Sequence, residues 1–181
     1  MTENELKKIV ARHYIPIYKN KITTEDEEYC LSEFMDGGLH FYQRIMIACK
    51  KLGIQYVYDI GCCYGHQAIL FLKEGIGYTG IERSTYIRPR FIKAGVRYEM
   101  KHFPCDLLTY GTWEDSAMIS SLCITFLQDN EQELRDQVIA MCKDAKYYIG
   151  TVSTEYLDLI EEYYDTVSYN DDLYIGKRKD S

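Results

Sequence analysis

Apolar residues recur along the 181-residue chain in two patterns that alternate with each other. Short apolar and aromatic runs are typical of buried strands, and apolar residues spaced three or four positions apart are typical of amphipathic helices. Strands are predicted in the run between Gly53 and Gly61 and at 77–82, 97–103, 117–126 (with the exit from the strand) and 146–152, followed by a hairpin of 163–169 and 173–177. Helices are predicted at 5–14, 39–52, 67–73, 91–94, 131–142 and 154–161.

Strands that alternate with helices predict an α/β fold, in which helices cover both faces of a parallel sheet. We expect a three-layer sandwich with a seven-stranded, mostly parallel sheet. The closing hairpin, with its turn at 170–172, is expected to add one antiparallel strand at the edge. The chain is most economically a single domain, 1–181, in which 1–52 form an N-terminal helical cap and 53–181 form the core.

One strand–turn–helix segment carries the clearest functional pattern. The predicted strand ends at Asp59 and Ile60, and Gly61 and Gly65 mark a tight turn before the helix at 67–73. Glycine adopts positive φ at little cost and lets a ligand approach the backbone, and the N–H groups at the start of a helix can face an anionic or polar ligand. The turn is therefore expected to bind a nucleotide-like ligand.

The next strand supplies an acid at a matching position. It ends in Glu82, 21 positions after Gly61. A carboxylate there can accept hydrogen bonds from both hydroxyls of a ribose. The dinucleotide motif G-x-G-x-x-G fits poorly, because Gly61, Cys63 and His66 occupy its three glycine positions. An NAD(P)-dependent enzyme is therefore disfavoured.

Residues 59–65 (DIGCCYG) resemble the D-x-G-x-G-x-G loop of class I S-adenosylmethionine-dependent methyltransferases, with Cys63 in place of the middle glycine. Glu82 falls where that family carries its ribose-binding acid. Asp106, within 103–107 (FPCDL), falls where an acid approaches the adenine amino group. The resemblance covers roughly residues 54–178 and implies a Rossmann-like fold with S-adenosyl-L-methionine as cofactor. The cofactor-binding residues that it implies are Asp59, Gly61, Cys63, Gly65, Glu82 and Asp106.

The acceptor side of the site has weaker signals, and no catalytic residue is assigned. Amide- and amine-methylating members of the family often carry [N/D/S]-P-P-[Y/F] after the fourth strand, and residues 120–129 (SSLCITFLQD) contain no proline. Asp129 and Asn130 are candidates near the expected mouth of the site, followed by His40 and Tyr14. Residues 34–40 (FMDGGLH) are expected to form a lid, because two glycines allow a hinge.

Two functions stay open. The first is a methyltransferase that acts on a small molecule, a protein or RNA. The second is a catalytically degenerate binding or regulatory subunit of the same fold. Cys63, whose side chain is expected to crowd the loop, and the missing acceptor motif favour the second, whereas Asp59, Glu82 and Asp106 favour the first.

Composition limits the expected binding partners and cellular compartment of the chain. A net charge of -7 disfavours tight, non-specific binding to nucleic-acid backbones. Seven cysteines without a C-x-x-C pair suit a reducing compartment and predict no metal site. No apolar run approaches the ~20 residues that span a bilayer, and the first residues do not resemble a secretory signal. A cytoplasmic protein without a membrane partner is expected, and a protein partner stays open.

Overall fold

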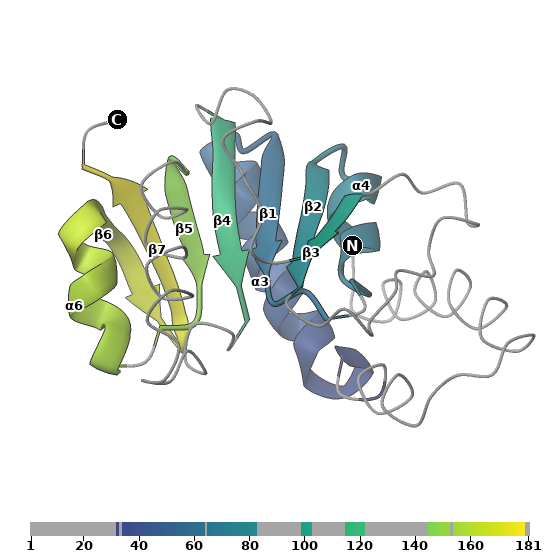
Figure 1. Ribbon diagram of the computed structural model, residues 1–181, viewed down its shortest axis with the longest axis horizontal. Helices are drawn as coiled ribbons and strands as arrows, with labels where there is room; N and C mark the ends of the chain where they lie inside the picture. The colour runs from purple at the N-terminus through teal and green to yellow at the C-terminus, as the bar shows by residue number, and fades with distance from the viewer. Residues whose placement is uncertain are drawn as a thin grey trace, which may run out of the picture.

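A computed structural model describes residues 32, 34–63, 65–82, 99–102, 115–121, 145–152 and 154–179. These residues form one seven-stranded sheet in the order β3-β2-β1-β4-β5-β7-β6 (Figure 1). The strands are β1 (Tyr56–Ile60), β2 (Gly77–Glu82), β3 (Glu99–His102), β4 (Ser116–Ser120), β5 (Tyr147–Gly150), β6 (Tyr164–Asn170) and β7 (Leu173–Arg178). The helices are the π-helix η1 (Phe34–Gly38), α3 (Leu39–Leu52), α4 (Ala68–Lys73) and α6 (Thr154–Tyr163).

The predicted fold class is confirmed. β1 to β5 pair in parallel, and helices lie on both faces of the sheet (Figure 1). The predicted helices at 5–14, 91–94 and 131–142 lie outside the described residues. The division of the chain at residue 52 stays a prediction. Within the described residues, no helix combines the length and the apolar character needed to cross a bilayer.

Alternate side chains of β1 enter two cores on opposite faces of the sheet. Val57 packs in the core with α3 and α4, whereas Tyr58 and Ile60 pack in the core toward α6. β1 is buried at four of its five positions, and it lies between two other strands. Buried parallel strands read as continuous apolar runs rather than alternating ones, and this is why the sequence marks β1 so clearly.

The hairpin differs from the expectation. β7 pairs antiparallel with both β5 and β6, so the antiparallel strand lies inside the sheet and β6 forms the edge. The predicted antiparallel edge strand was wrong because β7 is the more apolar strand: Leu173 and Tyr174 are buried, whereas 165–167 in β6 are exposed. The register shift between Thr166 and Ser168 also suits an edge, because irregular strands pair poorly with other chains.

The predicted helix 39–52 is confirmed as α3. It ends at Gly53, whose left-handed φ of 71° and backbone N–H close the last turn. α3 leads directly into β1 and runs antiparallel to it, so its first turns lie at the carboxyl end of that strand (Figure 1). The segment 34–40, which is expected to form a lid, contains the π-helix η1 directly before α3, and its action as a lid stays a prediction. Gly38 is right-handed (φ -59°, ψ -36°), and η1 continues into α3.

Candidate functional site

The strand order reverses at β1: β2 and β3 are added on one side of it, and β4 and the later strands on the other. Ile60, the last residue of β1, pairs with Ile81 of β2 and with Ser120 of β4. In open α/β sheets, ligands bind outside the carboxyl ends of the strands at such a reversal. The loop that follows β1 therefore leaves the sheet at the position where this fold places a ligand.

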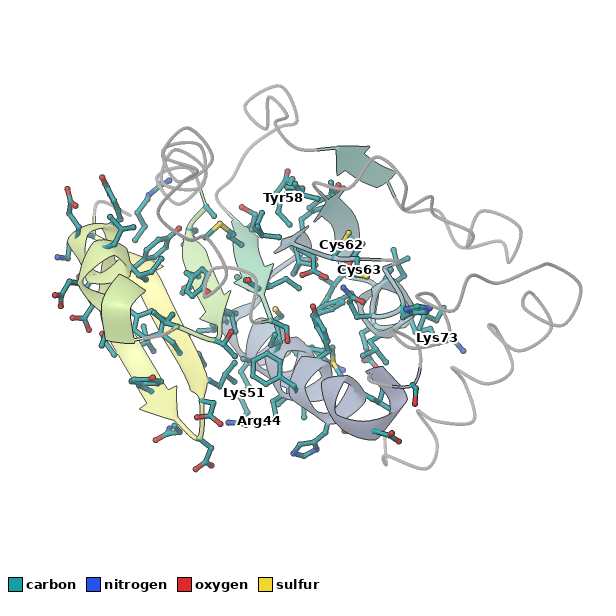
Figure 2. All side chains as sticks on the ribbon, turned by 60° about the horizontal axis from the view of Figure 1, so that its bottom comes forward. Arg44, Lys51, Tyr58, Cys62, Cys63 and Lys73 are labelled. Carbon is teal, nitrogen blue, oxygen red and sulfur yellow. The ribbon has the colours of Figure 1, made fainter. Side chains whose placement is uncertain are left out.

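This loop contains three left-handed residues at alternate positions. Gly61, Cys63 and Gly65 have φ angles of 71°, 51° and 70°. A residue other than glycine pays about 1–2 kcal/mol for this conformation. Cys63 stands at the middle glycine position of the resembled motif, and its backbone has a left-handed conformation that glycine adopts readily. Its side chain is half-buried, and Figure 2 shows it beside Cys62 in the loop.

Backbone hydrogen bonds fix the start of the loop against β2. The N–H groups of Gly61 and Cys62 both donate to the carbonyl oxygen of Ile81, at 2.8 and 3.2 Å. The Cys62 side chain is buried over Gly80, where an added Cβ would lie 2.5 Å from the Cys62 Sγ. Glycine at position 80 is thus required for this close approach. Cys62 is a packing residue, whereas the Cys63 thiol stays half-buried.

Asp59 is the centre of a buried hydrogen-bond network. Its carboxylate is fully buried and accepts from Tyr42 Oη (3.3 Å), Tyr78 Oη (2.6 Å) and Gln67 Nε2. The Gln67 amide also donates to the carbonyl oxygen of Cys62 at 3.1 Å and lies 3.3 Å from Tyr42 Oη. The network joins α3, β1 and β2 to the loop, so Asp59 holds the loop through Gln67.

Two titratable side chains, Tyr78 of the network and His66 before Gln67 in the chain, are held neutral. Burial, and next the Asp59 carboxylate, raise the pKa of Tyr78 well above its ordinary value, so its phenol keeps the proton that it donates. His66 is 3% exposed, and burial lowers its pKa to about 3. A buried, neutral imidazole with so low a pKa is a poor general base near pH 7.

The other residues predicted for the site fall into two groups. Glu82 ends β2, one position beyond the Ile60–Ile81 pair, and so lies beside the first residue of the loop; its side chain lies outside the described ones. His40 is exposed in the first turn of α3. Tyr14, Asp106, Asp129 and Asn130 lie outside the described residues. The structure thus brings together the backbone positions of Asp59, Gly61, Cys63, Gly65 and Glu82.

Sequence reasoning missed three members of the Asp59 network. Gln67 follows the loop, and its place in the sequence predicts only the start of a helix. Tyr42 carried a usable signal, since it lies on the buried stripe of α3 with Ile45, Met46 and Cys49 at helical spacing. Tyr78 carried none, because the direction of a strand side chain among 18 tyrosines depends on the packing of both faces.

Solved structures of methyltransferases are among those that match this fold. The chain matches magnesium protoporphyrin IX methyltransferase from Synechocystis, solved with bound SAM, over 99% of this chain and 98% of that one, at 11% identity and a TM-score of 0.58. It matches the sugar N-methyltransferase KedS8 from Streptoalloteichus over 74% and 56%, at 14% identity and a TM-score of 0.55. It matches TehB from Haemophilus influenzae over 76% and 62%, at 12% identity and a TM-score of 0.57. No protein-family model and no curated protein sequence matches the chain. The chain has the Rossmann-like fold of class I methyltransferases.

Proposed function

We propose that the chain is a methyltransferase that binds S-adenosyl-L-methionine at the carboxyl ends of β1 and β2. The observation that carries this proposal is the loop after β1, where the strand order reverses. Gly61, Cys63 and Gly65 in this loop are all left-handed. Cys63 has a side chain where the motif has glycine, but its backbone has the left-handed conformation that glycine favours. The loop therefore offers the same backbone surface to a ligand that three glycines would offer.

Each site residue has a distinct proposed task. Gly61 and Gly65 turn the chain so that the backbone can approach the cofactor, and Glu82 accepts hydrogen bonds from the ribose. Asp59 positions the loop through Gln67, whose amide donates both to the Asp59 carboxylate and to the Cys62 carbonyl oxygen. Asp106 is proposed to bind the adenine amino group. We assign Asp59 to positioning because its carboxylate is fully buried and receives three donors from the protein.

Bound S-adenosyl-L-methionine would supply an electrophilic methyl group on a sulfonium. Transfer of that methyl needs an in-line approach by a nucleophile, so the protein contributes mainly by holding the two reactants in place. A general base is needed only for an acceptor that arrives protonated. The acceptor is a small molecule, a protein or RNA, and its identity decides whether such a base is required.

Calorimetry with S-adenosylmethionine, S-adenosylhomocysteine and NAD in parallel tests the cofactor. We expect the first two to bind and NAD to show no heat. The Glu82→Ala variant should lose roughly 1–3 kcal/mol of binding free energy, the range for removing one partner of a buried polar group. Binding of NAD alone would refute the proposal, and unchanged affinity in Glu82→Ala would remove Glu82 from the site.

Labelled-methyl transfer to fractionated cell extract tests the reaction itself. Incorporation that the Glu82→Ala variant lowers supports the enzyme and yields a fraction from which the acceptor can be purified. Cofactor binding without incorporation into small-molecule, protein or RNA fractions would instead support the binding or regulatory subunit.

A further inference from the structure

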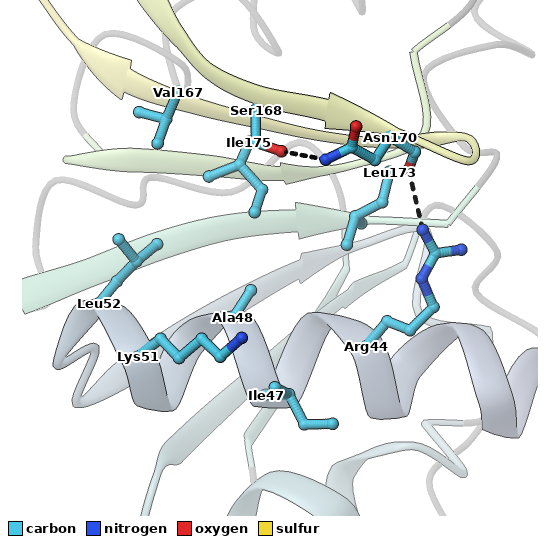
Figure 3. A pocket seen from close by; sticks show the side chains of 10 residues that line it. All are labelled: Arg44, Ile47, Ala48, Lys51, Leu52, Val167, Ser168, Asn170, Leu173 and Ile175. Atoms are coloured by element: carbon cyan, nitrogen blue, oxygen red, sulfur yellow. Dashed lines mark hydrogen bonds between the residues drawn. The ribbon is translucent and has the colours of Figure 1, made fainter.

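A groove runs between α3 and the β6–β7 hairpin, on the face of the sheet opposite to α6 (Figure 3). Its volume is about 320 Å³. Residues of α3 spaced three or four positions apart form one wall, among them Ile47 and Lys51. Val167, Leu173 and Ile175 contribute apolar side chains to the other wall. The groove lies beside the edge of the sheet, away from the loop that follows β1 (Figure 2).

The groove leaves apolar side chains open to water. Ile47 is 41% exposed and Val167 is 53% exposed, and they belong to the few large hydrophobic side chains that are exposed in the described part of the chain. On the opposite face, α6 covers the same hairpin and buries Tyr164 and Tyr174. The hairpin thus has a covering helix on one face, and the groove occupies the corresponding position on the other.

The walls of the groove are held together before any partner binds. Arg44 reaches from α3 to the hairpin turn, where Nη1 donates to the carbonyl oxygen of Asp171 (2.8 Å) and Nη2 to that of Asn170 (2.9 Å). This contact closes one end of the groove, as Figure 3 shows. A preformed groove does not require ordering when it binds, and that lowers the free-energy cost of association.

The charge of the groove is opposite to that of the chain. Arg44 lies at one end, and the Lys51 ammonium lies along α3 near Ala48 and Ile47 (Figure 3). None of the acidic side chains that the structure describes lines the groove. Carbonyl oxygens receive the Arg44 guanidinium without neutralising it. The chain as a whole has a net charge of -7. Two basic side chains beside apolar ones select a partner that has an apolar stripe with acidic side chains beside it.

The dimensions of the groove favour a helix as that partner. Arg44 and Lys51 are seven positions apart on α3, which corresponds to roughly 10 Å or two helical turns. An amphipathic helix presents apolar side chains over such a length at i, i+3, i+4 and i+7. We propose that the groove binds an amphipathic helix of another protein, which carries aliphatic side chains on one face and Asp or Glu beside them. The proposed interaction does not rest on the proposed methyl transfer.

A labelled synthetic helix tests the proposal on the full chain. The probe has 14 residues, a leucine stripe at i, i+3, i+4 and i+7, flanking glutamates and a fluorescein label. Its control is the same helix with lysine in place of each glutamate. We expect saturable binding of the acidic helix, measured by fluorescence polarisation, and binding at least ~tenfold weaker for the lysine helix. Methyl-group NMR should place the largest shifts at Ile47 and Val167.

Paired variants locate the contact. Lys51→Ala should weaken binding of the acidic helix roughly two- to fivefold, which is the range for one exposed ion pair. Lys50→Ala is the matched control, because Lys50 contacts Glu74 and does not line the groove, and it should bind as the unmodified chain does. Ile47→Asp should remove most of the binding, and because Ile47 is already 41% exposed the fold should survive.

Three results would overturn the proposal. The first is the absence of saturable binding by the acidic helix, and the second is equal binding of the acidic and lysine helices. The third is concentration-dependent self-association that Ile47→Asp abolishes, measured by sedimentation, because it would make a second copy of the chain the occupant.

Discussion

Cys63 shows how one residue can depart from a motif while its backbone does not. With a φ of 51°, it holds a left-handed conformation that glycine adopts freely and that other residues adopt at a cost of about 1–2 kcal/mol. Gly61 and Gly65 on either side keep the same conformation without that cost. The loop is therefore determined by its surroundings rather than by the preference of Cys63.

Replacing Cys63 with glycine should relieve this strain. We expect Cys63→Gly to leave the fold intact, to raise the free energy of unfolding by up to ~1 kcal/mol, and to preserve or tighten binding of S-adenosylhomocysteine. The gain is smaller than the strain because glycine also gains entropy in the unfolded chain. Cys63→Ala is the control, since alanine keeps the strain. Denaturation in urea and calorimetry measure the two effects, and a large loss of binding in Cys63→Gly would mean that the thiol packs against the ligand.

Variants of Gln67 and Tyr78 distinguish two roles of the Asp59 network, stabilising the fold and positioning the loop. Both donate to the Asp59 carboxylate, but only Gln67 also donates to the Cys62 carbonyl and so reaches the loop. We expect Gln67→Met and Tyr78→Phe to lower the free energy of unfolding by a similar ~1–3 kcal/mol, because each removes one donor from a buried carboxylate.

Cofactor binding should distinguish the two variants. Gln67→Met releases the loop and should weaken binding of S-adenosylhomocysteine by about tenfold, equivalent to ~1.4 kcal/mol, whereas Tyr78→Phe should change it little. Calorimetry at a temperature where both variants are folded provides the comparison. Equal losses of affinity would show that Asp59 alone, and not its link to the loop, matters for binding.

Among the elements, β4 and β5 pair at their carboxyl ends with no room for a side chain at position 150. Gly150 pairs with Ser120, and an added Cβ at Gly150 would lie against the Ser120 carbonyl oxygen. Backbone atoms within a paired sheet cannot move aside as a flexible side chain can. The glycine is therefore required by the spacing of the two strands and not by its own φ.

Gly150→Ala should lower the free energy of unfolding by about 3 kcal/mol, at the upper end of the range for overpacking. Gly37→Ala in η1 is the matched control, because nothing lies within 4 Å of its added Cβ. This control should change stability by less than ~1 kcal/mol, in the stabilising direction, since alanine restricts the unfolded chain. A small effect of Gly150→Ala in thermal or urea denaturation would mean that the strands can separate at this point.

Several elements were predictable because local sequence determines them. The helix 39–52 and the strand 77–82 match α3 and β2 at both ends, where an apolar pattern stops at glycine or at a charged residue. The predicted segment 117–126, a strand with the exit from it, overlaps β4 (Ser116–Ser120), and residues 122–126 lie outside the described residues. The order of the hairpin strands was mispredicted because it depends on which strand is buried, and burial is a property of the assembled sheet.

The candidate site also has features that the sequence predicts and features that it does not. The turn at Gly61 and Gly65 and the position of Glu82 at the end of β2 could be predicted, because spacing along the chain determines them. The roles of these residues toward a cofactor stay predictions. The Asp59 network could not be predicted, since Tyr42 and Tyr78 come from 17 positions before Asp59 and 19 positions after it. They meet only after α3 and β2 have packed against β1. A single sequence contains no direct record of that convergence.

For the whole molecule, the buried His66 links folding to pH. In the unfolded chain its pKa is near 6.5, and in the folded chain burial lowers it to about 3. Between these values the unfolded chain binds a proton that the folded chain does not, so the free energy of unfolding falls as the pH falls from 6.5 toward 3. Above pH 6.5 this group adds no pH dependence.

The expected size of this effect is about 2 kcal/mol between pH 7 and pH 5, at roughly 1.4 kcal/mol per unit below pH 6.5. Carboxylates also titrate at low pH, so the measurement compares the chain with His66→Gln, which removes one titrating group and keeps a polar side chain. Urea denaturation at pH 7, 6 and 5 should show a weaker pH dependence in His66→Gln. The same slope in both proteins would mean that His66 is protonated in the folded state.

The single helix α3 carries two side chains that make separate contacts, one beneath the loop and one at the hairpin. Tyr42 points inward to Asp59 beneath the loop, and Arg44, two positions later, points outward to the turn of the hairpin. A helix that slides or rotates as a unit cannot shift one of these contacts and leave the other still. Thermodynamic linkage makes any such coupling reciprocal: the factor by which an event at the hairpin changes affinity at the loop equals the factor by which an event at the loop changes affinity at the hairpin.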